Sequence, residues 1–244
     1  MEPEDTLKNT VGYVKISDED STKAVIKNAI GSLWEAVNEL TRLRPERQTH
    51  YSVSIFGSAR IAPDSPYYGQ VRDLARALAE MNCNIITGGG PGMMQAANEG
   101  ASAATRGTLD RSVGIRIELP FEQDVNPFVQ HVFTHKTFFT RLHHFVLTSD
   151  AFVVVPGGIG TVLEAMMVWQ LLQCRHVTNT PLIFVGDMWK ELVDWGRTFM
   201  LDKESPLASA GDFDIPICVD SAKEVIDIIA EHHKRWASAN QPQG

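Results

Sequence analysis

Residues 151–164 read AFVVVPGGIGTVLE, a short apolar run that passes through a glycine-rich turn into a helical pattern. The run Ala151–Val155 is typical of a buried strand in a parallel sheet. Glycines in the turn let a ligand approach without meeting a Cβ, and the first amides of the following helix point outward. With the partial positive charge of a helix start, these amides predict an anion site, to which the Thr161 hydroxyl adds a donor.

The same alternation of strand and helix continues through most of the chain. Strands are predicted at Ser52–Phe56, Asn84–Thr87, Val113–Ile117, Ala151–Val155, Leu182–Val185 and Ile215–Val219. Helical patterns lie between and after them at Tyr67–Met81, Met93–Thr105, Lys136–Leu147, Thr161–Cys174, Trp189–Met200 and Ala222–Trp236. Such alternation implies parallel strands joined by right-handed crossovers. We therefore expect an α/β fold, a three-layer, Rossmann-like, doubly wound parallel sheet with helices on both faces and ligands at the carboxyl ends of its strands.

One further helical pattern precedes the first strand. Apolar residues between Ser21 and Arg44 recur at helical spacing, and Ser21 can cap the start. The length of 244 residues suits one large domain. We predict a single Rossmann-like domain over residues 21–237 that includes this helix, with tails at 1–20 and 238–244.

Two more strands end in informative turns. Gly57-Ser58-Ala59-Arg60 follows the first strand, and Thr87-Gly88-Gly89-Gly90-Pro91-Gly92 follows the second and opens a helix. A lone glycine-rich turn is equally well explained by tight chain reversal, but the turns at residues 87–92 and 156–161 both join a strand to a helix, and two such turns favour a ligand site. Neither of these two turns is a P-loop, and neither has the G-x-G-x-x-G spacing of dinucleotide folds. The residues expected to bind phosphate or substrate are Ser58, Arg60, Gly88, Gly89, Gly90, Gly92, Met93, Gly157, Gly158, Gly160 and Thr161.

Two charged residues are candidates for chemistry beside these turns. Glu164 lies three residues after Thr161, so helical geometry places its carboxylate on the side of the phosphate turn, where the helix start favours the ionised form. One helical turn is about 5.4 Å, comparable with the reach from a 5′-phosphate to its ribose, so Glu164 could face the sugar. Arg141 lies in an apolar helical stretch and needs an anionic partner, either Glu164 or the ligand. A solvent-facing or capping Glu164 and a surface Arg141 are the alternatives.

Composition and charge exclude several classes of function. The formal net charge of −8 argues against a nucleic-acid partner, because such binding rests on many Lys and Arg contacts to phosphate. No apolar run approaches the roughly 18 residues that span a bilayer, which argues against a membrane partner. Met1–Asp20 lacks the pattern of a secretory signal, so we expect a cytoplasmic protein. Cys83, Cys174 and Cys218 are far apart and are expected to be buried free thiols.

A metal site and a pyridoxal phosphate site are both rejected. His131, His135, His143 and His144 are close in sequence, but no carboxylate or cysteine is placed to complete a metal shell, and 131–135 spans a predicted strand and loop. No lysine follows either glycine turn to form a Schiff base, so decarboxylase chemistry has no support. We predict no cofactor and no metal.

The turns resemble those of the LOG family, the cytokinin riboside 5′-monophosphate phosphoribohydrolases, long mislabelled as lysine decarboxylases. The motifs are Gly57-Ser58-Ala59-Arg60, Gly88-Gly89-Gly90-Pro91-Gly92-Met93-Met94 with Ala96-Ala97-Asn98, and Pro156-Gly157-Gly158-Ile159-Gly160-Thr161 ending in Glu164. The resemblance covers about Ser52–Met200 and implies that Arg141 and Glu164 act on the substrate. In the family the arginine is followed by a lysine, whereas this chain has Leu142.

The resemblance also implies a reaction and an assembly. We expect hydrolysis of the N-glycosidic bond of a purine nucleoside 5′-monophosphate, such as AMP or an N6-substituted, cytokinin-type analogue, to free base and ribose 5-phosphate. The alternative is a nucleotide-binding or sensor protein of the same fold without turnover, which Leu142 favours. A homodimer is implied as well, for which the apolar residues Met166, Met167, Val168, Trp169 and Leu171 could supply the contact unless they belong to the core.

Overall fold

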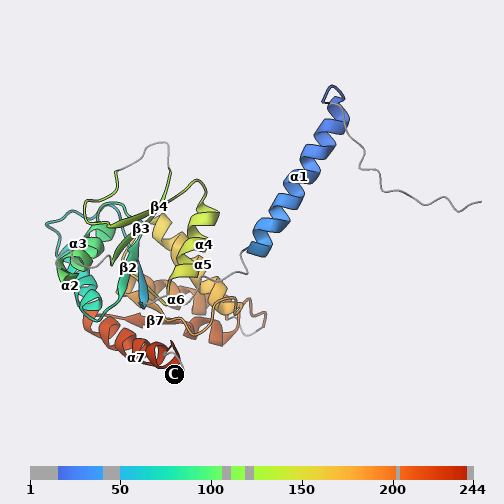
Figure 1. The fold of residues 1–244 in the computed structure, drawn as a ribbon. Helices are drawn as coiled ribbons and strands as arrows, with labels where there is room; N and C mark the ends of the chain where they lie inside the picture. Colours follow the sequence, from blue (N-terminus) through green and yellow to red (C-terminus); the bar gives the residue numbers. More distant parts are fainter. Residues whose placement is uncertain (1–15, 41–49, 106–110, 119–123, 202–203, 241–244) are drawn as a thin grey trace, which may run out of the picture. The chain divides into compact units, whose positions relative to one another are not determined.

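The computed structural model describes residues 16–40, 50–105, 111–118, 124–201 and 204–240 (Figure 1). The chain divides into two compact units, Met1–Glu46 and Arg47–Gly244. The first unit contains helix α1 (Glu19–Leu40). The second contains, in chain order, β1 (Ser52–Phe56), α2 (Pro66–Glu80), β2 (Asn84–Thr87), α3 (Met93–Thr105), β3 (Ser112–Ile117), β4 (His131–His135), α4 (Phe138–Thr148), β5 (Ala151–Val154), α5 (Ile159–Gln173), β6 (Leu182–Val185), α6 (Asp187–Met200), the 3-10 helix η1 (Ala210–Asp214), β7 (Pro216–Val219) and α7 (Ala222–Asn240).

The strands of the described residues form one seven-stranded, all-parallel sheet in the order β4-β3-β2-β1-β5-β6-β7. The predicted doubly wound sheet is confirmed, and three of the six predicted strands have the predicted bounds. The six buried runs did not include β4, which lies at one edge of the sheet beside β3. Its residues His131–Thr134 are exposed, so it has no apolar run that marks a buried strand.

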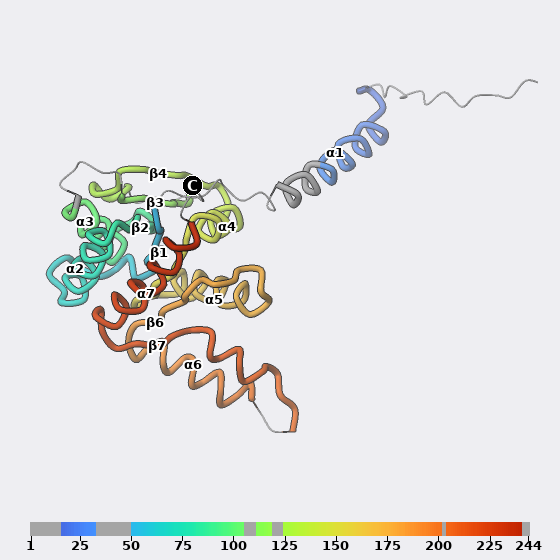
Figure 2. The backbone as a smooth tube through the Cα atoms, turned by 60° about the horizontal axis from the view of Figure 1, so that its bottom comes forward, coloured from blue at the N-terminus to red at the C-terminus, as the bar shows by residue number. Residues whose placement is uncertain are grey.

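Helices cover both faces of the sheet, as predicted (Figure 2). Alternate residues of a strand point to opposite faces, so Val53 and Ile55 pack with the buried residues of α2, α3 and α7, whereas Phe56 packs with those of α4, α5 and α6. Both core clusters contain side chains at 0% exposure, among them Ala75 on the first face and Trp189 on the second. The sheet is therefore the rigid middle layer of three.

Several element boundaries differ from the prediction for local reasons. α4 begins at Phe138 because Thr137 caps it, with the Thr140 amide donating to Thr137 Oγ1 at 3.2 Å. α5 begins at Ile159, directly after Gly158 at its N-cap. α7 continues to Asn240, so Ser238–Asn240 are helical and not part of a tail. Residues 241–244 of the predicted tail lie outside the described residues.

Helix α1 is the described element of the first unit. Asp18, and not Ser21, supplies the cap, because the Ser21 amide and hydroxyl donate to the Asp18 carboxylate at 3.2 and 2.7 Å. Glu19 and Asp20 are helical, while residues 1–15 of the predicted tail and 41–44 of the predicted helix lie outside the described residues. That α1 and the sheet form a single domain stays a prediction.

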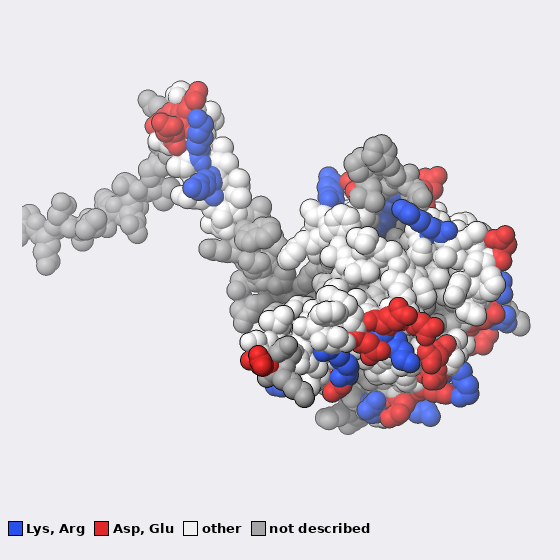
Figure 3. Space-filling view, turned by 180° about the vertical axis from the view of Figure 1, so that it is seen from behind, with Lys and Arg blue, Asp and Glu red and all other residues white. Residues whose placement is uncertain are grey.

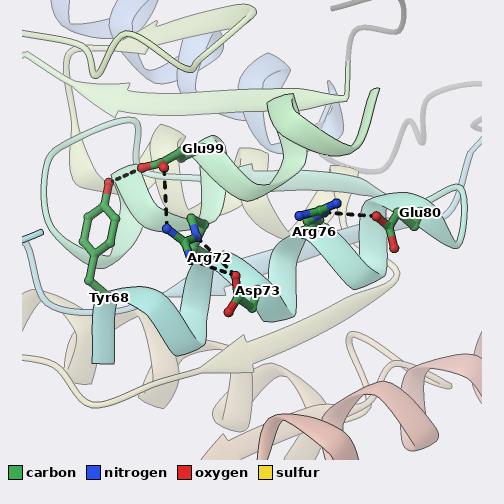
Figure 4. Close-up of polar contacts among 6 residues, drawn as sticks. All are labelled: Tyr68, Arg72, Asp73, Arg76, Glu80 and Glu99. Atoms are coloured by element: carbon green, nitrogen blue, oxygen red, sulfur yellow. Dashed lines mark hydrogen bonds and ion pairs between the residues drawn. The ribbon is translucent and has the colours of Figure 1, made fainter. Parts of the chain in front are cut away.

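Helices α2 and α3 pack closely, and polar contacts join them (Figure 4). A Cβ at Gly100 would collide with the Arg72 carbonyl oxygen, so a glycine is needed for this approach. The Tyr68 hydroxyl donates to Glu99 Oε2 at 2.7 Å, and Arg72 Nη1 lies 4.0 Å from Glu99 Oε1. Burial and the Glu99 carboxylate raise the pKa of Tyr68 to about 12, so the phenol keeps its proton near neutral pH. These contacts fix α3, whose first turn borders the site described below.

The surface departs from the sequence expectations at two cysteines. All three cysteines are free, but only Cys83 is buried, whereas Cys174 and Cys218 are exposed. Cys174 is the C-cap residue of α5, and Cys218 lies on the edge strand β7.

On the face seen in Figure 3, Lys and Arg side chains lie among Asp and Glu and form no continuous basic area. No helix among the described residues is long and apolar enough to cross a membrane.

Candidate active site

The three predicted turns meet where the strand order reverses. β1 lies between β2 and β5, so the chain leaves β1 in one direction and returns on its other side at β5. Ligands of open α/β sheets bind at the carboxyl ends of the strands beside such a point. The Ser58 amide donates to the Pro156 carbonyl at 3.2 Å, and the Met93 amide donates to the Ser58 carbonyl at 2.9 Å. These bonds join the turns after β1, β2 and β5.

The turn that opens α5 faces open space. Its first intrahelical bond runs from the Val162 amide to the Gly158 carbonyl at 3.0 Å, so the amides of Ile159, Gly160 and Thr161 have no acceptor within the helix. Gly158 and Gly160 are exposed, and a Cβ built on either meets no atom within 4 Å. Neither has a positive φ. Packing and backbone conformation therefore leave these two glycines unexplained, whereas a ligand close to the amides would explain them.

Gly157, in the same turn, has a structural reason. A Cβ there would collide with the Thr161 side chain, which is only 5% exposed. Gly157 thus lets Thr161 fold back beneath the turn. The amides of residues 159–161 thus lie above a packed base and form the candidate anion site.

The turn after β2 is filled by side chains of the chain itself. A Cβ on Gly88 would lie 2.6 Å from Arg141 Nη2 and 2.7 Å from Met94 Sδ, and one on Gly90 would lie 2.8 Å from Met94 Cε. Gly92 has a φ of +67° and lies against the Ser58 carbonyl, so it is required by both conformation and space. The Gly89 amide already donates to Thr87 Oγ1 at 2.9 Å. Arg141 and Met94 therefore occupy the space into which Cβ atoms on Gly88 and Gly90 would point, beside the expected second phosphate turn.

A buried polar network supports this turn from below. Thr87 Oγ1 donates to Asn98 Oδ1 at 2.7 Å, and Asn98 Nδ2 donates to Ser112 Oγ at 2.8 Å. Asn126 Nδ2 donates to the Gly90 carbonyl at 2.9 Å, and the Asn126 amide donates to the Gly89 carbonyl at 2.9 Å. Asn126 was missed by the sequence prediction because it comes from a loop far along the chain, whereas Asn98 stands in a motif that was singled out.

Arg141 and Glu164 form a buried ion pair beside both turns. Arg141 Nη1 lies 2.8 Å from Glu164 Oε1, and each residue is 8% exposed. Arg141 Nε donates to the Ile115 carbonyl on β3 at 2.8 Å, and the guanidinium carbon lies 5.1 Å from the centre of the Phe145 ring. The predicted pairing is present, and the alternatives of a capping Glu164 and a surface Arg141 are wrong.

The pKa of Glu164 is shifted in the direction opposite to the expectation. Burial raises the pKa of the Glu164 carboxyl above its ordinary value, and the charge and hydrogen bond of Arg141 oppose that rise. The helix start was expected to favour the carboxylate, but the removal of water from the group is the larger influence. Arg141 is thus the group that keeps the ionised form accessible.

Three other predicted site residues have different surroundings from those expected. Met93 is 1% exposed and belongs to the core, and its amide is engaged with Ser58. The half-buried residue of this helix start that faces the turn is Met94. The Ser58 hydroxyl accepts from the Arg60 amide at 3.1 Å, while the Arg60 residue is exposed. The structure therefore assigns Met93 to packing and Ser58 to joining the turns.

The neighbouring residues give no metal shell. His135 Nε2 and His144 Nδ1 are 2.9 Å apart, so these two histidines converge, a pair that was not predicted from the sequence. Within the described ranges, no group of three or more His, Cys, Asp or Glu residues is placed to hold a metal ion. Leu142, which follows Arg141, is only 9% exposed. An apolar, buried side chain therefore occupies the position after the arginine.

Comparisons with known proteins show which proteins the chain is similar to. A family model described as "Possible lysine decarboxylase" matches residues 94–229. The pyrimidine/purine nucleotide 5′-monophosphate nucleosidase of Escherichia coli K12 is 28% identical over 164 residues, 65% of this chain and 36% of that protein, and the protein of the same name in strain O157:H7 gives the same values. The chain thus spans about a third of the length of these relatives.

Solved structures share the fold at lower identity. The Moco carrier protein of Chlamydomonas reinhardtii superimposes with a TM-score of 0.55 at 17% identity, covering 76% of this chain and 99% of that one. The molybdenum cofactor binding protein of Rippkaea orientalis gives 0.54 at 19% identity, with 77% and 98% covered. At these identities the likeness establishes the architecture alone.

Proposed function

Because the chain belongs to the LOG family, we propose that it is a nucleosidase that hydrolyses the N-glycosidic bond of nucleoside 5′-monophosphates. The observation that carries this proposal is the buried Arg141–Glu164 pair, 2.8 Å between Nη1 and Oε1, one helical turn from the open amides of residues 159–161. The E. coli relatives carry the same activity in their name, which supports the reaction class.

The phosphate would bind at the start of α5. Free amides and the partial positive charge of a helix start stabilise an anion without any lysine, which suits a chain of net charge −8. A phosphate held there places the ribose one helical turn further along, toward Glu164. Binding energy from the phosphate then positions the reacting C1′ atom, which is remote from it.

Glu164 would stabilise the reacting sugar. Cleavage of the bond between C1′ and the base nitrogen develops positive charge on the sugar, resembling an oxocarbenium ion. The Glu164 carboxylate would balance this charge or hold a ribose hydroxyl or the attacking water. Water adds its hydroxyl to C1′ and its proton goes to the leaving base, giving ribose 5-phosphate and free base. Arg141 orients Glu164 through its ion pair.

The preferred base is part of the proposal. We expect purine nucleotides such as AMP, and N6-substituted, cytokinin-type analogues, to be substrates. The relatives' name covers pyrimidine as well as purine nucleotides, so both classes belong in the test. Incubation of purified protein with each nucleoside 5′-monophosphate, followed by chromatography, should show release of free base. If no nucleotide yields base, or if Glu164→Ala leaves the release unchanged, the proposal is wrong.

A second candidate is nucleotide binding without turnover. The specific observation that favours it is Leu142, a buried apolar residue where the family carries a lysine after the arginine. Proteins of the same fold include carriers and binders of the molybdenum cofactor, so the architecture is compatible with binding alone. Calorimetry that detects AMP binding, beside a product assay that detects no base, would favour this candidate over the enzyme.

A homodimer also belongs to the proposal, on the strength of the family resemblance. Of the residues expected to form the contact, Val168 is 0% exposed and belongs to the core, whereas Met166, Met167, Trp169 and Leu171 are half-buried. A contact through this helix would therefore use these half-buried side chains and not Val168. Light scattering at micromolar concentration should give twice the mass of the chain, and a monomer there would remove the idea.

A further inference from the structure

Gly88 lies directly against the guanidinium of Arg141. A Cβ built on Gly88 would be 2.6 Å from Arg141 Nη2, well inside the contact distance of about 3.5 Å between non-bonded heavy atoms. Gly88 has no positive φ, so its backbone does not itself demand glycine. The close approach of Arg141, together with that of Met94, is therefore the reason that the structure gives for a glycine at this position.

Two nitrogens of the guanidinium have polar partners, and the third lies against Gly88. Nε donates to the Ile115 carbonyl at 2.8 Å, Nη1 pairs with Glu164 at 2.8 Å, and Nη2 lies over Gly88. The first two contacts draw the group toward β3 and α5. The absence of a side chain on Gly88 lets Nη2 lie close to the backbone at the end of β2. A side chain on residue 88 would push Nη2 away and thereby disturb the ion pair on Nη1.

We propose that Gly88 is a positioning residue that seats Arg141 so that its guanidinium holds Glu164, while the phosphate is bound by the other turn alone. The assignment of a catalytic consequence rests on the proposed nucleosidase function. Under this proposal the two glycine turns have different tasks. The turn at residues 157–161 binds the phosphate, and the turn at residues 88–92 shapes the place of the arginine.

Gly88→Ala is an informative variant because the fold can accommodate the added methyl group. The atoms that a methyl group would meet are the ends of two flexible side chains, Arg141 and Met94, and not backbone. The protein should therefore fold, while Nη2 moves by about 1 Å to restore a normal contact. A misplacement of that size at a reacting site lowers the rate by about 10- to 100-fold. We expect this loss in kcat, with the Kd for AMP measured by calorimetry nearly unchanged.

Two further glycines provide matched controls. Gly90→Ala also collides with Met94, at 2.8 Å, but no atom of Arg141 is among its nearest contacts, so it separates displacement of the methionine from displacement of the arginine. Gly69→Ala lies in α2 with nothing within 4 Å of the added Cβ, and its kcat should equal that of the natural chain.

A double-mutant cycle tests whether Gly88 acts through Arg141. If it does, Gly88→Ala adds no loss to Arg141→Gln, and the double variant has the kcat of Arg141→Gln alone. If the two losses multiply, Gly88 acts by another route and the inference is wrong. Circular dichroism spectra check that each variant is folded before its rate is compared.

A second measurement does not depend on turnover. Carbon NMR of labelled glutamate carboxyl groups, with Glu164→Gln used for assignment, reports the pKa of Glu164. In Gly88→Ala we expect that pKa to rise, because a displaced Arg141 lowers it less, whereas Gly90→Ala should match the natural chain. An unchanged pKa in Gly88→Ala overturns the inference, even if the protein releases no base. Absence of base release by the natural chain overturns the proposed function instead.

Discussion

The two glycine-rich turns look alike in sequence but differ in what occupies the space beside them. Next to Gly158 and Gly160 there is open space and a helix start with free amides, whereas Gly88 and Gly90 are covered by Arg141 and Met94. A missing Cβ can thus make room for a ligand or for a side chain of the protein itself. A glycine motif in the sequence therefore predicts a close approach, but only the structure shows whether a ligand or a side chain approaches.

The same contrast separates glycines that the fold needs from glycines that it does not. Gly92, with φ +67° against the Ser58 backbone, and Gly157, against Thr161, are needed for packing. Gly158 and Gly160 have neither constraint. Substitutions along both turns should therefore divide into losses of stability and losses of binding.

The largest effect should come from Glu164, the residue that we propose acts on the sugar. Glu164→Gln keeps the shape of the side chain and removes its charge, so the developing positive charge on the sugar loses its balancing carboxylate. We expect kcat for base release to fall by about 10²- to 10³-fold, or roughly 3–4 kcal/mol. AMP binding by calorimetry should persist, because the amides of residues 159–161 are untouched. Loss of binding with an unchanged rate constant would contradict the assigned roles.

The next largest effect is a loss of stability in the turn at residues 88–92. In Gly92→Ala, an L-residue must adopt φ +67°, which costs about 1–3 kcal/mol, and its methyl group meets the Ser58 carbonyl. The melting temperature should fall by roughly 2–4 °C for each kcal/mol lost. An equal fall for Gly158→Ala, an exposed position with φ −92°, would abolish the distinction between the two turns.

A smaller effect, on binding, should come from the open turn. The methyl group of Gly158→Ala enters the space that we assign to the phosphate, so the Kd for AMP should rise about tenfold, which corresponds to roughly 1.4 kcal/mol. The melting temperature should stay the same, since nothing in the protein lies within 4 Å of the added Cβ. Calorimetry and a thermal scan on the same sample decide this, with Gly69→Ala as the control for both.

The smallest effect concerns pH. Because burial raises the pKa of Glu164, kcat/KM should decline on the acid side at a pH above the ordinary glutamate value of 4.5. The folded chain also binds this proton more tightly than the unfolded chain does, so its stability falls as pH rises through the unfolded and then the folded pKa. Glu164→Gln should remove that part of the pH dependence in urea titrations. A rate that stays constant below pH 4.5 would contradict the raised pKa.

Much of the fold follows from local sequence signals. β1, β2 and β6 are short, largely buried runs rich in β-branched and aromatic residues between turns, which is why they have the predicted bounds. The helices between these strands could be predicted from the helical spacing of their apolar residues and from their capping residues. β4 escaped the set of buried strands because an exposed edge strand has no such run, and Asp18 was missed as a cap because it precedes the apolar periodicity.

The candidate site was predicted in its charged residues and less well in its turns. A buried arginine needs an anion, so the pairing of Arg141 with Glu164 could be anticipated although they lie on different helices. Which of Met93 and Met94 faces the site depends on how α3 lies on the sheet, and one position along a helix changes the direction by about 100°. The contact of Asn126 with the Gly89 and Gly90 carbonyls is set by a distant loop. Local sequence carries no information on it.

A crystal structure with bound AMP would show which of the two turns holds the phosphate. We predict that the phosphate accepts hydrogen bonds from the amides of residues 159–161, with the ribose against the Glu164 carboxylate and Met94 still covering Gly88 and Gly90. A phosphate held by the turn at residues 88–92, or a ribose turned away from Glu164, would contradict this prediction.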